Sequence, residues 1–176
     1  MIRLFGAARI CILLLVVAAL FGCTNNAPPE GQPSFYQDLA GPAATLDAAA
    51  AQSMISGYRH NNGLDAVTLD PELMRLADEQ ASAMAAAGKL DHEVAHPFQE
   101  RIRKSHFDAG VAVENIGAGY HTLAEAFSGW RDSPPHRANM LNASVTRMGI
   151  AAIYTPKSKY KVFWALILAA PDQRHS

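Results

Sequence analysis

The chain has 176 residues, 49% of them hydrophobic, and a formal net charge of −1. This length suits one domain with a proper core, and the lack of a basic block in the sequence argues against a nucleic-acid partner. The only two cysteines, Cys11 and Cys23, lie near the N-terminus, so no disulfide is expected within the globular part of the chain.

The N-terminus has the layout of an export signal. Arg3 and Arg9 precede an apolar run over residues 10–21, which is shorter than the roughly 20 residues of a membrane-spanning helix. The run ends at Leu20-Phe21-Gly22-Cys23, which resembles the lipobox of bacterial lipoproteins. The resemblance implies that residues 1–22 are a lipoprotein signal peptide and that Cys23 is lipidated, which makes the membrane a partner. An ordinary signal peptide and an uncleaved anchor are the alternatives.

Proline, glycine, alanine and asparagine dominate the segment after this signal, without apolar periodicity. Such a composition is typical of a flexible linker, so residues 23–45 are predicted to be a lipidated tether. Residues 46–170 have the composition of a globular domain, and residues 171–176 are predicted to be a tail.

Three helices are predicted in the first half of the domain. Residues 46–62 carry apolar side chains at helical spacing and are followed by Gly63 as a cap. Asp70-Pro71 is a strong helix start, because an acid can cap a helix and proline is tolerated in its first turn, and Gly88 ends this second helix. Residues 98–104 are predicted to form a short third helix.

Strands and helices alternate in the second half. Residues 110–114 are predicted to form a short strand, and Thr122-Leu123-Ala124-Glu125 has the pattern of a capping box. Ser133-Pro134 begins another short helix. Residues 145–154 and 160–169 are rich in β-branched and aromatic side chains, which favours a terminal hairpin. This order predicts an α/β fold, a three-layer α-β-α sandwich with a small, mostly antiparallel sheet.

A series of short motifs runs through the domain. They are Arg59-His60-Asn61-Asn62-Gly63-Leu64, Leu69-Asp70-Pro71-Glu72-Leu73, Leu90-Asp91-His92, Glu114-Asn115, the block from Trp130 to His136-Arg137, Met148-Gly149-Ile150 and Phe163-Trp164. In this order they resemble the CAP superfamily (cysteine-rich secretory, antigen 5 and pathogenesis-related-1 proteins, with an SCP-like domain) in its bacterial form. The resemblance implies the same sandwich and a shared cavity, but it does not define a reaction.

The resemblance also implies a cavity built from two histidines and acidic residues. Carried over by position, these are His92, Glu114 and His136, with Asn115 beside the acid. The family often has a second acid a few residues after the tryptophan. In this chain no glutamate stands there, so either Asp132 replaces it or the set is reduced to three residues.

Two interpretations of this set stay open. Neutral imidazoles of His92 and His136 are good metal ligands, but zinc takes four donors, of which catalytic sites usually draw three from the protein. A weakly bound zinc or other divalent cation is therefore the most that is expected, and no cofactor is required. Alternatively, Glu114 pairs with the histidines, raises their pKa and ties three segments together.

One motif points elsewhere. His92-Glu93-Val94-Ala95-His96 fits the H-E-x-x-H pattern of zinc peptidases. That motif functions only in a continuous helix, and Pro97 disfavours helical geometry at His96. A zinc-peptidase site is therefore not predicted.

Three functions remain. The favoured one is a lipid-anchored binding module of the bacterial envelope, whose cleft holds a small apolar or glycan-like ligand, such as a lipid, sterol-like or cell-wall molecule. The second is a metal-assisted hydrolase of peptides or cell-wall material, with Glu114 as general base. The third is a non-catalytic structural or partner-binding lipoprotein. Thr24, in place of aspartate after Cys23, resembles outer-membrane sorting in Gram-negative bacteria and implies the periplasmic face of that membrane.

Overall fold

The computed structural model describes residues 31–172. The predicted signal peptide, Cys23 and the last four residues lie outside the described residues, so the inferences about them stay predictions. Within residues 31–172, no helix has the length and apolar character that crossing a membrane would require.

The helices and strands follow one another much as predicted. In chain order they are η1 (Ser34–Tyr36, a 3-10 helix), α1 (Ala48–His60), β1 (Thr68–Leu69), α2 (Pro71–Ala87), α3 (Phe98–Lys104), β2 (Ala109–Ala118), α4 (Leu123–Asp132), α5 (Pro134–Met140), β3 (Arg147–Tyr154) and β4 (Val162–Pro171). Two differences stand out. Strand β2, which carries the site, runs past its predicted end at Glu114, and the short strand β1 at the opposite edge of the sheet was not predicted.

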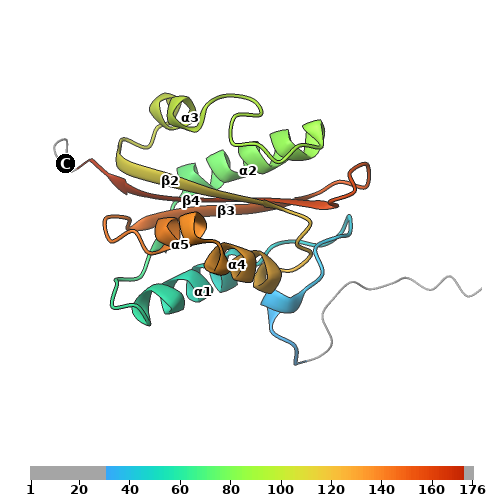
Figure 1. Ribbon diagram of the computed structural model, residues 1–176, viewed down its shortest axis with the longest axis horizontal. Helices are drawn as coiled ribbons and strands as arrows, with labels where there is room; N and C mark the ends of the chain where they lie inside the picture. Colours follow the sequence, from blue (N-terminus) through green and yellow to red (C-terminus); the bar gives the residue numbers. More distant parts are fainter. Residues whose placement is uncertain (1–30, 173–176) are drawn as a thin grey trace, which may run out of the picture.

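The four strands form one sheet in the order β1-β3-β4-β2. Strand β1 is parallel to β3, while β3 and β2 both pair antiparallel with β4. Figure 1 shows α2 and α3 on one face of the sheet and α1, α4 and α5 on the other. The prediction of a three-layer sandwich with a mostly antiparallel sheet is therefore confirmed, and β2 lies at the edge.

The central strand β4 joins two hydrophobic cores. Its side chains alternate between the faces of the sheet, as the pleat of a strand requires. Val162, Trp164, Leu166 and Leu168 pack with α1, α4 and α5, whereas the intervening Phe163, Ala165, Ile167 and Ala169 pack with α2 and α3. Because it is covered on both faces, β4 is a continuous apolar run instead of an alternating one.

Local sequence explains where the main helices begin and end. The Asp70 side chain accepts hydrogen bonds from the first turn of α2, and Gly88 adopts a left-handed conformation (φ 64°) at the other end. Thr122 and Glu125 form the predicted capping box of α4. These caps satisfy main-chain groups that a helix leaves without partners.

The folded part of the chain begins earlier than residue 46. The amide of Leu39 donates to the carbonyl of His121 at 2.7 Å, its side chain is buried in the core, and the Ser34 hydroxyl donates to Asp47. The second half of the predicted tether is therefore packed against the domain. Phe35, Leu39 and two alanines of this segment pack on the core without helical or strand periodicity, which is why the sequence pattern did not reveal that the segment belongs to the domain.

Candidate functional site

Strand β2 turns Glu114 and Asn115 toward different helices. Successive side chains of a strand point to opposite faces, so Glu114 faces the layer of α3, where it contacts Arg101. Asn115 faces the layer of α5, and its Nδ2 donates to the carbonyl of His136 at 3.0 Å. Glu114 and Asn115, which are neighbours in the sequence, thus connect strand β2 to the helix layers on both faces of the sheet.

The free edge of β2 is covered by side chains from α4 and α5. Asn139 donates to the main-chain carbonyl of Glu114 at 3.1 Å, and the indole Nε1 of Trp130 donates to the carbonyl of Ile116 at 3.0 Å. An edge strand otherwise exposes such groups to pairing with another chain. Trp130 is buried in the core, and its indole also protects the sheet edge.

The carboxylate of Glu114 has a partner at each oxygen. Its Oε1 lies 2.8 Å from Nδ1 of His92, and its Oε2 accepts a hydrogen bond of 2.7 Å from Nη2 of Arg101. The Glu114 side chain is 1% exposed and that of Arg101 is 7% exposed. The structure therefore brings Glu114 and His92 together. Where a second imidazole was expected, however, it places a guanidinium.

His92 forms the exposed end of this network. Its hydrogen bond to Glu114 raises the pKa of His92, although burial acts in the opposite direction. The imidazole is still 48% exposed. A buried acid thus orients a ring whose other edge remains accessible to a ligand.

His136 is held through its main chain. It occupies the third position of α5, after the cap at Ser133, and its carbonyl accepts from Asn115, which is itself bonded to Asn139. Burial, followed by the positive charge of His92, lowers the pKa of His136. The two histidines are therefore within electrostatic reach of each other, but only His92 touches Glu114.

Asp132 lies outside this arrangement. Its carboxylate is 67% exposed and pairs with Nε of Arg131 at 2.8 Å. Residues two positions apart lie on nearly opposite sides of a helix, so Asp132 faces solvent because Trp130 faces the core. Of the two alternatives for the second acid, this geometry does not support replacement by Asp132 and favours the set without it.

The donors present do not fit a divalent metal ion. Within residues 31–172, no group of three or more histidine, cysteine or acidic side chains could hold one. The segment 92–96 consists of turns and bends, so His92 and His96 do not share a helical face as H-E-x-x-H zinc sites require. The carboxylate that could have joined His92 as a ligand is already bonded at both oxygens.

A cleft of about 360 Å³ opens beside the edge strand. We call it the edge cleft, and it is lined by His92, Glu93, Pro97, Phe98, Gln99, Ala112, Val113, Glu114 and Asn139. It brings together an imidazole, two amides, two carboxylates and the ring of Phe98. Asn115 lies beneath it and braces α5.

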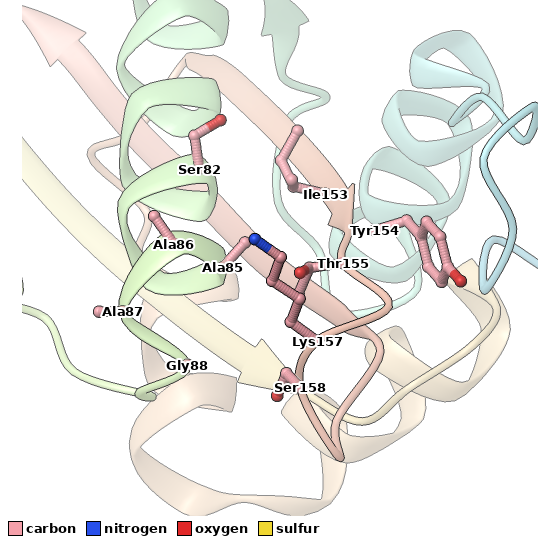
Figure 2. Close-up of a pocket in the computed structure, with 10 residues that line it drawn as sticks. All are labelled: Ser82, Ala85, Ala86, Ala87, Gly88, Ile153, Tyr154, Thr155, Lys157 and Ser158. Carbon is pink, nitrogen blue, oxygen red and sulfur yellow. The ribbon is translucent and has the colours of Figure 1, made fainter.

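A larger hollow of about 610 Å³ lies between the end of α2 and the β3–β4 turn. Figure 2 shows Lys157 extending from this turn toward α2, beside Ala85. None of the predicted site residues lines this hollow, and its only charged side chain is Lys157. The edge cleft is therefore the candidate functional site.

Sequence reasoning missed three residues of the site, namely Arg101, Phe98 and Asn139. Phe98 and Arg101 are three positions apart on α3 and so share a face, with the guanidinium 5.2 Å from the ring centroid. The available signal was an arginine next to Ile102 on the apolar side of a short helix, because a charged residue at such a position needs a buried partner. Asn139 lies three positions after His136 and therefore on the same side of α5. This shared side was the signal that Asn139 could belong to the site.

Comparisons with known proteins agree with this fold. The profile of the CAP family, the cysteine-rich secretory protein family, matches residues 52–168. The uncharacterized protein YkwD of Bacillus subtilis is 28% identical over 123 residues, which are 62% of this chain and 48% of YkwD. The chain thus spans about half the length of this curated relative.

Two solved bacterial structures are similar in fold. An outer surface protein of Borrelia burgdorferi superposes with a TM-score of 0.64 at 18% identity, covering 73% of this chain and 98% of that chain. An extracellular protein of Bacillus anthracis that contains an SCP domain gives a TM-score of 0.60 at 20% identity, covering 69% of this chain and 39% of that chain. At these identities the likeness shows the fold alone, and both relatives are surface or extracellular proteins.

Proposed function

Because the chain belongs to the CAP family of cysteine-rich secretory proteins, we propose that it is an exported binding module, anchored to the bacterial envelope through Cys23, whose edge cleft takes a small glycan-like ligand. The observation that carries this proposal is the pairing of a buried acid with a half-exposed imidazole. Glu114 fixes the ring of His92 at the cleft wall without being accessible itself.

The lining of the edge cleft suits a sugar-like molecule. His92 and Gln99 can donate or accept hydrogen bonds. The Asn139 oxygen can accept one, since its nitrogen already donates to Glu114 and Asn115, while the ring of Phe98 offers an apolar surface beside them. Ligand sites commonly combine apolar walls with a few polar groups that fix orientation. A purely apolar ligand would leave these polar groups without partners, which is costly.

Binding is better supported than hydrolysis. A general base must come within hydrogen-bond reach of the proton that it removes. Glu114 is 1% exposed and both its oxygens are engaged, so a substrate in the cleft would meet His92 first. Glu114 is accordingly a positioning residue in this proposal.

Export is supported by the sequence and by the surface or extracellular relatives, whereas anchoring is supported by the lipobox-like sequence before Cys23. If Cys23 carries the lipid, fatty-acid label will enter the protein in its bacterial host, and Cys23→Ser will abolish the labelling and release the protein from membranes. Retention of label in Cys23→Ser would refute the anchor.

Saturation-transfer NMR tests the ligand class. The probes are soluble disaccharide-peptide fragments of the cell wall and, separately, a medium-chain fatty acid. We expect transfer to the sugar protons, lost in His92→Ala and kept in His96→Ala, which alters an exposed histidine four positions along the same loop. Transfer to the fatty acid alone, or transfer unchanged by His92→Ala, would contradict the proposal.

A further inference from the structure

The guanidinium of Arg101 occupies an environment that resembles the coordination shell of a cation. Its Nη2 lies 2.7 Å from Oε2 of Glu114 and 3.4 Å from the carbonyl oxygen of His92, and its Nε lies 3.3 Å from the carbonyl oxygen of His96. The ring of Phe98 closes another side at 5.2 Å. Carboxylate and carbonyl oxygens thus converge on one buried positive charge.

The same contacts organise the cleft wall. The loop from His92 to His96 has no regular secondary structure, and two of its carbonyls accept from Arg101. Gln80 of α2 adds a third restraint, since its Nε2 donates to the carbonyl of Asp91 at 2.8 Å. Arg101 therefore positions His92 in two ways. It holds the main chain of the loop, and it holds Glu114, which bonds the His92 ring.

A divalent ion at His92 and Glu114 would compete with Arg101. It would need the carboxylate oxygens that Arg101 and His92 already occupy. It would also lie close to a fixed positive charge in a largely buried setting, where repulsion is stronger than in water. Asp132 does not offset this charge, because it pairs with Arg131 at the surface, and the second acid of the cleft lining, Glu93, is exposed to solvent.

We infer that Arg101 is the resident cation of the edge cleft and that it excludes a divalent metal ion. It is a positioning and specificity-determining residue, which keeps Glu114 neutralised and His92 free for a ligand. This inference concerns metal exclusion and does not depend on which ligand the cleft takes.

Measurement of zinc binding to the purified, chelator-treated protein tests whether Arg101 excludes a divalent metal ion. Native mass spectrometry and calorimetric titration with zinc chloride are applied to the wild type, Arg101→Gln, His92→Ala and the double variant Arg101→Gln/His92→Ala. Arg103→Gln is the matched control, because Arg103 is an exposed arginine on the same short helix. Folding of each variant is checked by circular dichroism.

The wild type and Arg103→Gln are expected to bind no zinc that depends on His92. Removing a positive charge a few ångströms from a dication should strengthen binding by roughly a hundredfold, so Arg101→Gln gains a site that the double variant loses. If Arg101→Gln binds zinc no better than the wild type, Arg101 is not the excluding group and the inference fails.

A second measurement covers the case in which Arg101→Gln does not fold. The imidazole nitrogens of the wild type are followed by NMR during a zinc titration. The His92 signals should stay unchanged up to millimolar zinc, with Nδ1 still bonded to Glu114. A stoichiometric zinc site of micromolar affinity at His92 in the wild type would overturn the inference.

Discussion

The Nη2 atom of Arg101 lies 2.7 Å from Oε2 of Glu114, and both side chains are almost wholly buried. The pair joins the short helix α3 to the edge strand β2, and from there it holds His92 at the wall of the cleft. A buried ion pair need not stabilise a fold relative to apolar residues of similar size, but removal of one partner leaves the other charge uncompensated.

Arg101→Met should therefore destabilise the domain strongly. The expected loss is about 3–5 kcal/mol, because Glu114 would remain buried without its cationic partner. Urea denaturation measures the loss. Arg103→Met, which changes an exposed arginine two positions later, should stay within about 0.5 kcal/mol of the wild type.

The double variant Arg101→Met/Glu114→Leu should be more stable than Arg101→Met alone. Removing both charges eliminates the unpaired group, which is the main cost of the single change. The same denaturation series measures the coupling. A double variant that loses as much as the sum of the two single changes would show that the pair is not energetically coupled.

The two histidines of the site should titrate in a fixed order. The hydrogen bond to Glu114 raises the pKa of His92, whereas burial and the charge of His92 lower the pKa of His136. Two-dimensional NMR of the imidazole protons should show His136 losing its proton at lower pH than His92. Glu114→Gln, if folded, should bring the two transitions closer together, and the reverse order would refute the arrangement.

The bond from His92 to Glu114 should stabilise the fold more in acid than in alkali. A histidine whose pKa is raised in the folded state contributes stability that is fully present below the ordinary imidazole pKa of about 6.5 and is lost as pH rises through the folded pKa. The difference in melting temperature between the wild type and His92→Gln should thus be larger at about pH 5.5 than at about pH 8.5. An equal difference at both pH values would show that protonation of His92 plays no part.

Two glycine-to-alanine substitutions should change the stability of the fold in opposite directions. A Cβ at Gly149 of β3 would overlap main-chain atoms of Leu73 and Met74 where α2 crosses the sheet, so Gly149→Ala should cost at least about 2 kcal/mol. Gly57 is a helical position with open space around its would-be Cβ. Gly57→Ala should stabilise α1 by about 0.5–1 kcal/mol, as thermal denaturation of both variants can show.

Local sequence signals were sufficient for most of the elements. Asp70-Pro71 with Gly88 bounded α2, and the capping box at Thr122 began α4, because caps and turns depend on residues that are neighbours in the chain. The apolar run of β4 similarly indicated a strand. The bounds of β2 and the existence of β1 were missed, since the extent of a strand depends on the partner with which it pairs.

The sequence by itself determined the family, the layer order and the candidates His92, Glu114, Asn115 and His136, because these follow from short motifs in a fixed order. Only the tertiary structure decided which of them meet. Arg101 reaches Glu114 from thirteen residues away through the packing of α3 on β2, and Asp132 turns outward because Trp130 turns inward. Contacts between distant segments depend on how helices and strands pack, and a pattern along the chain does not contain that geometry.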